Sequence, residues 1–405
     1  MEKKTVMIIM GLTLLWGGVA LADSGLLFKS QRDALAAKGF TFDAHVIEDY
    51  VSVFNGGLIH KDTWLGRFDL SAELDLEKAG ILKGGTVHIG MMNAHGGMKP
   101  TADGMVADLQ TVSNIEAPRT TRIYEAWYNQ SLLDNRLSVK FGLVDLNSEF
   151  LVSDSGNLFI NSAFAIASGM FVNTDSDSIY PQPAPAVRLQ YSPNDSFVFL
   201  AGLFQGNPLG PDINEHSTHF GTKEGLLSIE EGQYHYKLPL AGGLAGVLKT
   251  GFWYNSKHAE NVPDADNDVD PVIHHQDYGA YVMLDQAVFR VKDAQGLNVF
   301  LLAAGAPEDR NQVQGSLGGG INYKGLIPYR ENDVTGFALT SASISDKLRE
   351  VSGQGHSETT YEWTYQVQIN DSIHIQPDIQ YVVHPNANND TKNASVFMLR
   401  TDIHF

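Results

Sequence analysis

The last eleven residues, SVFMLRTDIHF, constrain the fold of this chain more than any other segment. If they form a strand, one face carries Ser395, Phe397, Leu399, Thr401, Ile403 and Phe405, and the other carries Val396, Met398, Arg400, Asp402 and His404. A mostly apolar face, a mostly polar face and an aromatic carboxyl terminus are typical of a strand with lipid on one side and water on the other. We expect this strand to close a barrel by pairing with an early strand. Arg400, Asp402 and His404 would then face the lumen or its periplasmic rim, and Phe405 would join the aromatic girdle.

The amino terminus has the features of an export signal. Lys3 and Lys4 precede an apolar run over residues 6–16, and Ala20 and Ala22 occupy the positions that a signal peptidase reads. We predict a signal peptide at 1–22, cleaved before Asp23; the alternative is a membrane-anchoring helix, for which the apolar run is short. No later stretch has 18 apolar residues, so the mature chain is either a secreted β protein or an outer-membrane barrel.

Composition narrows the chemistry. The chain has no cysteine, so it has neither disulfides nor thiolate chemistry. Removing the predicted signal peptide takes the net charge from −19 to −20, with 26 basic and 46 acidic residues. Such a balance argues against nucleic acid as a partner, because phosphate binding needs cations.

A period of two recurs from residue 67 to the end, and no second pattern interrupts it. It is clearest over residues 67–76, 87–92, 124–129, 137–143, 187–191 and 360–369. We therefore predict an all-β chain: a transmembrane antiparallel β-barrel over residues 41–405, with no domain boundary. Residues 23–40 are expected to form a short N-terminal periplasmic helical segment.

The connections between these segments differ in length in an ordered way. Short ones lie near 131–136, 192–196 and 370–372, and long ones span 93–121, 145–185, 208–224 and 256–276. One short rim and one long rim are typical of an outer-membrane barrel. At about 20–25 residues per strand and connection, the chain has room for about 16 strands, although 18 would also fit. A barrel of this size encloses an aqueous lumen.

Several segments, in this order and spacing, resemble the OprB-type carbohydrate-selective porins. They are RDALAAKGFTF (32–42), LDLEKAGILKGGTVHI (74–89), YEAWYNQ (124–130), GLVDLNSEF and SGNLFINSAF (within 142–164), PAPAVRLQYSPND (183–195), LAGLFQGNP (200–208), APEDRN (306–311), YKGLIPYRENDVTG (323–336) and TYQVQINDSIHIQPDIQYVVHPN (364–386). The resemblance implies a sixteen-stranded barrel with an N-terminal periplasmic helix and passive sugar uptake. One departure is the stretch SGLLFKSQ, where the family commonly has Trp-Gly-Gly. Substrate preference varies in the family, so a particular sugar does not follow.

A pore can favour a sugar with charged groups that exchange hydrogen bonds with hydroxyls, and with an aromatic face beside them. Glu125 and Trp127 are our first candidates. Tyr124, Ala126 and Tyr128 make a better lipid face than Ile123, Glu125 and Trp127, because a carboxylate facing lipid is costly. The alternative is a Trp in the interfacial girdle with a carboxylate at the rim.

Other inward charges follow from the same alternation. They are Asp69, Glu73, Lys140, Arg188 and Glu362. We expect them to line the pore and to contact substrate; the alternative is that they solvate the lumen or pair with one another.

The longest connection, residues 145–185, is too long for an ordinary turn. We hypothesise that it folds inward as a constriction loop, with Asp154, Asn157, Asn161 and Phe164 at the narrowing. The alternative is an external loop that packs on the barrel mouth.

Metal and enzyme signals are weak. Asp264, Asp266, Asp268 and Asp270 have a calcium-like spacing, but Val269 and His275 stand where an EF-hand loop has Gly and Glu. His216, His219, His274 and His275 are more simply loop histidines than metal ligands. No motif for a nucleophilic serine, a zinc hydrolase or a nucleotide site is present, so we predict no enzyme, no cofactor and no metal.

These observations predict a Gram-negative outer-membrane porin for passive diffusion of carbohydrates through a water-filled, partly selective channel. A general or anion-preferring porin and a secreted β-sheet lectin or adhesin are the alternatives. The expected partners are mono- or oligosaccharides and outer-membrane lipid with lipopolysaccharide. A homotrimer and a monomer both stay open.

Overall fold

The computed structural model describes residues 29–174, 178–207, 214, 216–218, 225–239, 243–256, 259–260, 273–274, 276–292 and 295–405. The predicted signal peptide and the first part of the helical segment therefore lie outside the described residues. So does the acidic stretch 263–271, the candidate calcium loop.

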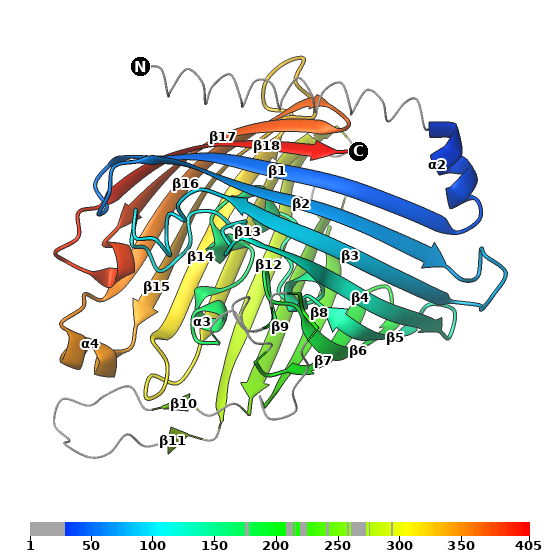
Figure 1. The fold of residues 1–405 in the computed structure, drawn as a ribbon, viewed down its shortest axis with the longest axis horizontal. Coiled ribbons are helices and arrows are strands. Elements are labelled where there is room, and N and C mark those ends of the chain that lie inside the picture. The colour runs from blue at the N-terminus through cyan, green and yellow to red at the C-terminus, as the bar shows by residue number, and fades with distance from the viewer. Residues whose placement is uncertain are drawn as a thin grey trace.

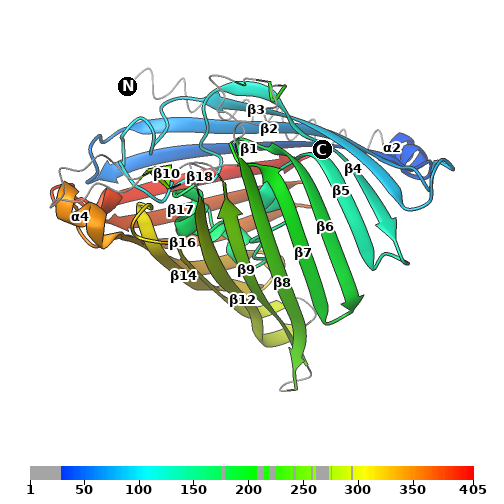
Figure 2. The same cartoon turned by 90° about the horizontal axis from the view of Figure 1, so that it is seen from below.

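Sixteen strands among the described residues form one closed antiparallel barrel (Figures 1 and 2). They are β1 (Phe40–Asn55), β2 (Asp62–Asp75), β3 (Gly85–Gly96), β4 (Thr120–Leu132), β5 (Leu137–Val144), β6 (Ala184–Asn194), β7 (Phe197–Gln205), β8 (Leu226–Leu238), β9 (Leu244–Asn255), β12 (Asp277–Lys292), β13 (Gln295–Gly305), β14 (Val313–Lys324), β15 (Val334–Ile344), β16 (Ser357–Asn370), β17 (Ile373–Val383) and β18 (Ala394–His404). This confirms the predicted fold class and strand number.

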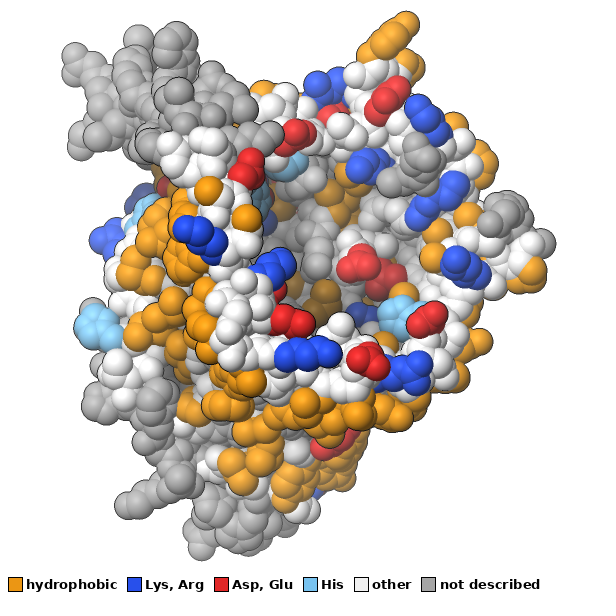
Figure 3. All heavy atoms as spheres, turned by 90° about the vertical axis from the view of Figure 1, so that its right-hand side faces the viewer, with side chains coloured by type: hydrophobic (Ala, Val, Ile, Leu, Met, Phe, Trp, Pro, Cys, Tyr) orange, Lys and Arg blue, Asp and Glu red, His pale blue; other side chains and the backbone are white. Residues whose placement is uncertain are grey.

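Side chains along each strand point alternately to the lipid and to the inside of the barrel. On β16, the outward Tyr361 and Trp363 are 40% and 48% exposed, whereas the inward Glu358 and Glu362 are completely buried. A period of two places successive side chains on opposite faces, so this strand carries an aromatic outer face and an acidic inner face. Figure 3 looks at the barrel from one end: apolar side chains cover the outside, and charges of both signs surround a hollow.

The two rims differ as expected. One has short connections such as 133–136, 195–196 and 371–372, together with α2 (Lys29–Ala36) and the C-terminus. The other has long connections, which include β10 (Ala259–Glu260), β11 (Ile273–His274), α4 (Asp346–Ser352) and η4 (Pro385–Ala387). None of the helices in the described part of the chain has the length and apolarity needed to cross a membrane.

The barrel closes between its first and last strands. β18 pairs with β1 over His45–Val53, and this confirms that the C-terminal strand pairs with an early strand. The seam has a buried ion pair, in which the Arg400 Nε donates to the Asp49 Oδ1 at 2.7 Å. Both residues face inward, as the alternation of the C-terminal strand predicts for Arg400.

The apolar core lies inside the barrel, where two long connections fold against the wall. Residues 97–119 pack on β1, β2, β17 and β18 through Met105, Val112 and Ile115. Residues 145–183, which we call the inward loop, pack with their described part on strands β5 to β9, β12 and β13 through residues such as Phe150 and Met170. The inward loop contains η1 (Leu146–Ser148), η2 (Gly156–Leu158), η3 (Ser162–Phe164) and α3 (Ser168–Phe171). Apolar burial therefore holds both loops inside the barrel.

A β-bulge on β4 changes the predicted faces at one point. The pairing with β3 shifts between Gly90 and Met91, so Tyr124 is the extra residue. Ile123 is consequently exposed on the outside, whereas Tyr124 is buried inside and donates a hydrogen bond to Asp145. The prediction that Tyr124 faces lipid and Ile123 faces the lumen was wrong, because a bulge adds one residue to the alternation.

Candidate functional site: the inner wall and the inward loop

Five inward side chains on neighbouring strands form a continuous row, which we call the wall row. It consists of Glu73, His88, Trp127, Lys140 and Arg188, one residue from each strand from β2 to β6. Glu73 lies opposite His88, His88 lies opposite Trp127, and Lys140 lies opposite Arg188. All four residues of this row that the sequence predicted as pore residues therefore share one stretch of wall.

The two cations of the wall row bind one carboxylate of the inward loop. Lys140 Nζ and Arg188 Nε both donate to Glu149, the arginine at 2.6 Å, and all three side chains are at most 10% exposed. A buried cation needs a partner of opposite charge, since leaving it unpaired is strongly destabilising. Lys140 and Arg188 therefore fasten the loop to the wall in this structure, and little of either side chain reaches channel water.

Trp127 is half-buried against its neighbours. Its ring stacks on His88, with centroids 4.7 Å apart and planes 7° apart, and the Lys140 Nζ lies 3.9 Å from the ring centroid. His88 comes from β3 and Lys140 from β5, so the indole is held between side chains of both neighbouring strands. Protein groups therefore occupy much of the aromatic surface that the sequence offered to a sugar ring.

Glu125 also contacts the start of the inward loop. Its Oε1 accepts hydrogen bonds from the backbone N–H of Asp145 at 3.2 Å and from the Ser148 hydroxyl at 3.4 Å. Asp145 in turn accepts from the Tyr124 hydroxyl and from the Asn147 N–H. Burial raises the pKa of the Asp145 carboxyl from 3.8 to about 6. This junction is therefore a buried acidic cluster that orients the loop.

Asp69 and Glu73 keep more contact with the channel. The Asp69 carboxylate pairs with Arg67 Nε at 2.7 Å and is 21% exposed. Arg67 lies over the rings of Tyr124 and Tyr180, 5.0 and 4.5 Å from their centroids. Glu73 is 45% exposed, and its Oε2 lies 3.7 Å from the His88 Nδ1. Of the wall charges predicted from sequence, Glu73 is the most accessible.

Further along the barrel, buried wall carboxylates hold the inward loop by its backbone. Glu362 accepts from the N–H groups of Ile160 and Asn161 at 2.6 and 3.0 Å. Glu231 on β8 and Asp285 on β12 bind the loop in the same way, and they accept from the N–H groups of Leu151 and Ser155 respectively. Glu362 faces inward as predicted, but it is wholly buried beneath the loop and does not line open channel.

The four loop candidates divide into two pairs. Asn161 is buried and donates to the Gln110 carbonyl and to Gln380, and Phe164 packs against Phe159 and Phe300. Both were expected at the narrowing, but their side chains are needed to pack the loop on the wall. Asp154 and Asn157 are exposed, and their side chains form no hydrogen bond within the described part of the chain.

Asp154 and Asn157 face a cavity of about 500 Å³ between the loop and the wall of β9 and β12 to β16, which we call the chamber. Its charged lining residues are Asp154, Asp285, Arg290 and Lys324, whose formal charges cancel. Its amide lining residues are Asn157, Gln286, Asn298, Asn322 and Gln366. Arg290 donates to Asn298 at 2.7 Å and Asn298 donates to Asn322 at 2.8 Å. The chamber is thus neutral overall and dense in groups that both donate and accept.

Sequence reasoning missed several of these residues. Glu149, Glu231 and Asp285 were not singled out, and neither was Glu358, which accepts from Leu109 and Gln110 of the other inward-folded loop. Alternation would have misplaced Glu231, because it shares a face with Leu227 and Ile229, and an apolar face is expected to point to lipid; in the structure all three are buried inside. Of the candidate loop histidines, only His216 has a described side chain, and its Nδ1 lies 3.0 Å from the Thr121 carbonyl oxygen.

Comparisons with known proteins agree with this architecture. The family model described as "Carbohydrate-selective porin, OprB family" matches residues 60–405. Porin B of Pseudomonas aeruginosa is 23% identical, covering 90% of this chain and 87% of the relative, and the putative porin QuiX of Acinetobacter baylyi is 22% identical, covering 93% and 91%. The high-pH structure of Pseudomonas putida OprB superimposes with a TM-score of 0.82 at 21% identity, covering 93% of this chain and 97% of that one.

The family match covers most of the chain, and the likeness to the solved structure shows the same fold. Both point to a channel rather than an enzyme. The fold and the family also place the protein in a Gram-negative outer membrane. The chain therefore belongs to the carbohydrate-selective porins of the OprB family, and it is an outer-membrane channel for sugars.

Proposed function

We propose that sugars pass between the inward loop and the wall of the chamber, and that Asp154 and Asn157 contact them there. The observation that carries this proposal is a pair of exposed loop side chains that face a neutral, amide-rich chamber and form no hydrogen bond with any described residue. A sugar has many hydroxyls and no charge, so it can exchange hydrogen bonds with these groups one after another. Each contact is weak, which permits release and therefore conduction.

The wall row has a different role in this proposal. Lys140, Arg188 and Glu125 position the first turn of the inward loop, and Glu362 positions its middle. The loop then narrows the channel, and its exposed side chains do the selecting. Passage needs no chemistry and no energy input, so the residues named here bind and position sugars and none of them is catalytic.

The charge balance of the lining residues favours a sugar channel over an anion-preferring porin. The chamber has two acidic and two basic lining residues, and the wall row with Glu149 adds two cations and two carboxylates. Anion preference needs an excess of positive charge at the narrow part of the pore. Balanced charge there favours a neutral solute.

Current block by sugars in planar bilayers tests the proposal. Asn157→Ala and Asp154→Ala should each weaken block by about 2- to 12-fold, because each loses a hydrogen bond worth about 0.5–1.5 kcal/mol. Asn389→Ala, an exposed amide on the long-loop rim that does not line the chamber, is the matched control. Equal block in wild type and in both chamber variants would overturn the assignment, and an absence of block by any mono- or disaccharide would indicate a general porin.

A further inference from the structure

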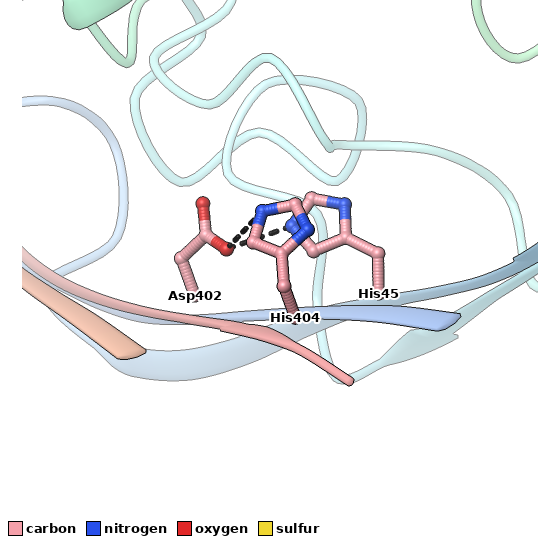
Figure 4. Close-up of side chains that lie close together, drawn as sticks. All are labelled: His45, Asp402 and His404. Carbon is pink, nitrogen blue, oxygen red and sulfur yellow. Dashed lines mark hydrogen bonds and ion pairs between the residues drawn. The ribbon is translucent and has the colours of Figure 1, made fainter. Parts of the chain in front are cut away.

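Two histidines and an aspartate converge where the barrel closes. His45 on β1 and His404 on β18 are directly paired, and Asp402 lies two residues before His404 on the same face (Figure 4). The Asp402 Oδ1 is 2.7 Å from the His45 Nε2 and 3.3 Å from the His404 Nε2. One ligand atom from each residue lies within 4.8 Å of the others. None of these residues belongs to the wall row or to the chamber.

The cluster is reachable from water. The side chains of His45, Asp402 and His404 are 20%, 21% and 45% exposed. They lie near the rim of short turns, beside the C-terminus and close to the beginning of β1. Asp43, on the same face of β1 two residues before His45, is exposed and adds negative charge nearby. A cation entering from this rim would meet a partly open, acidic site.

The donor set and its dimensions suit a divalent transition metal. Imidazole and carboxylate bind Zn²⁺ at about 2.0–2.2 Å, so adjacent ligand atoms of a tetrahedral site are about 3.3 Å apart. The His404–Asp402 separation already has this value, and the His45–Asp402 separation needs to open by about 0.6 Å. The two imidazoles are stacked 3.9 Å apart at 12°, so one ring must tilt to aim both nitrogens at one ion. His404, which is nearly half exposed, has room to tilt.

We propose that His45, Asp402 and His404 bind a divalent transition metal of the Zn²⁺ class at the periplasmic mouth of the barrel. Three protein ligands leave a fourth position for water, as in zinc sites that keep an open coordination position. The ion joins β1 to β18 across the seam between the two ends of the chain. Metal binding therefore stabilises the closed barrel, and the bound ion occupies the channel mouth.

Calorimetric titration of Zn²⁺ into the folded barrel, purified without a polyhistidine tag, tests the site. Wild type should bind one ion per chain, and His45→Ala and His404→Ala should each weaken binding at least 10-fold. The matched control is His95→Ala: His95 pairs with a single carboxylate, Glu48, at 2.9 Å, and the control should bind as wild type does. Heat-modifiable migration on a gel verifies that each variant is folded.

Two further readouts separate a metal site from a hydrogen-bonded triad. Cu²⁺ bound in place of Zn²⁺ should show coupling to two imidazole nitrogens by electron paramagnetic resonance, and to one in either histidine variant. Zn²⁺ should raise the unfolding temperature of wild type and of His95→Ala, but not of His45→Ala. An absence of Zn²⁺ binding by wild type, or binding that is unchanged in the double variant of His45 and His404, would overturn the proposal.

Discussion

Replacing Glu362 with alanine should release the middle of the inward loop from the wall. The variant loses two hydrogen bonds, from the N–H groups of Ile160 and Asn161, and leaves both groups buried without their partner. Leaving a buried N–H group without its partner costs about 1–3 kcal/mol, or about 2–6 kcal/mol for the pair. Asp378, buried on β17, interacts with Glu362, and removing one of two neighbouring acids offsets part of this loss. A net cost of about 2–4 kcal/mol raises the released population of the loop by about 30- to 1,000-fold.

Single-channel recording measures this release directly. Glu362→Ala should show a larger mean conductance and more open-channel noise than wild type, and weaker discrimination between mono- and disaccharides. The double variant with Glu231→Ala, which also frees Leu151, should show more of each. Glu230→Ala is the matched control, because the adjacent Glu230 does not contact the loop and should leave the conductance unchanged. Conductance distributions that are the same in all four proteins would refute the conclusion that wall carboxylates hold the loop.

Two other predictions concern the start of the loop and the wall row. Since the pKa of Asp145 is raised to about 6, the folded chain holds the proton of this carboxyl more tightly than the unfolded chain does. The free energy of unfolding should therefore fall as pH rises from about 4 to about 6, by at most about 3 kcal/mol. Asp145→Asn should lose this part of the pH dependence of thermal unfolding, and an unchanged pH profile would contradict the assignment. Trp127→Phe should change sugar block less than about 2-fold, because neighbouring side chains already cover much of the indole; a 10-fold loss of block would show instead that the ring contacts sugar.

The alternation of outward and inward side chains along the strands could be predicted from sequence, because each residue faces either lipid or the inside of the barrel and its polarity reflects that. Tyr361, Trp363 and Glu362 face the predicted sides, and the C-terminal strand closes the barrel as its pattern indicates. Tyr124 could not be placed this way. A bulge depends on how β4 pairs with β3, and nothing in the sequence of β4 alone marks the extra residue.

The sequence predicts that these charged side chains point inward, but it does not predict what they contact there. Lys140, Arg188 and Glu362 point inward as predicted, but whether an inward charge meets water or a folded loop depends on contacts between residues far apart in the chain. Glu362, for example, binds backbone groups that precede it by about two hundred residues. Asn161 and Phe164 were grouped with Asp154 and Asn157 because they lie on one connection, and only the path of that connection separates buried from exposed side chains.

The most direct test of the proposed sugar path is protection of Asn157→Cys from a thiol reagent. The chain has no other cysteine, so labelling by a membrane-impermeant methanethiosulfonate reports this position alone. If sugars cross the chamber beside the inward loop, a permeant sugar should slow modification of this variant several-fold and leave Asn389→Cys on the rim unaffected. Equal modification rates at position 157 with and without sugar would contradict the account.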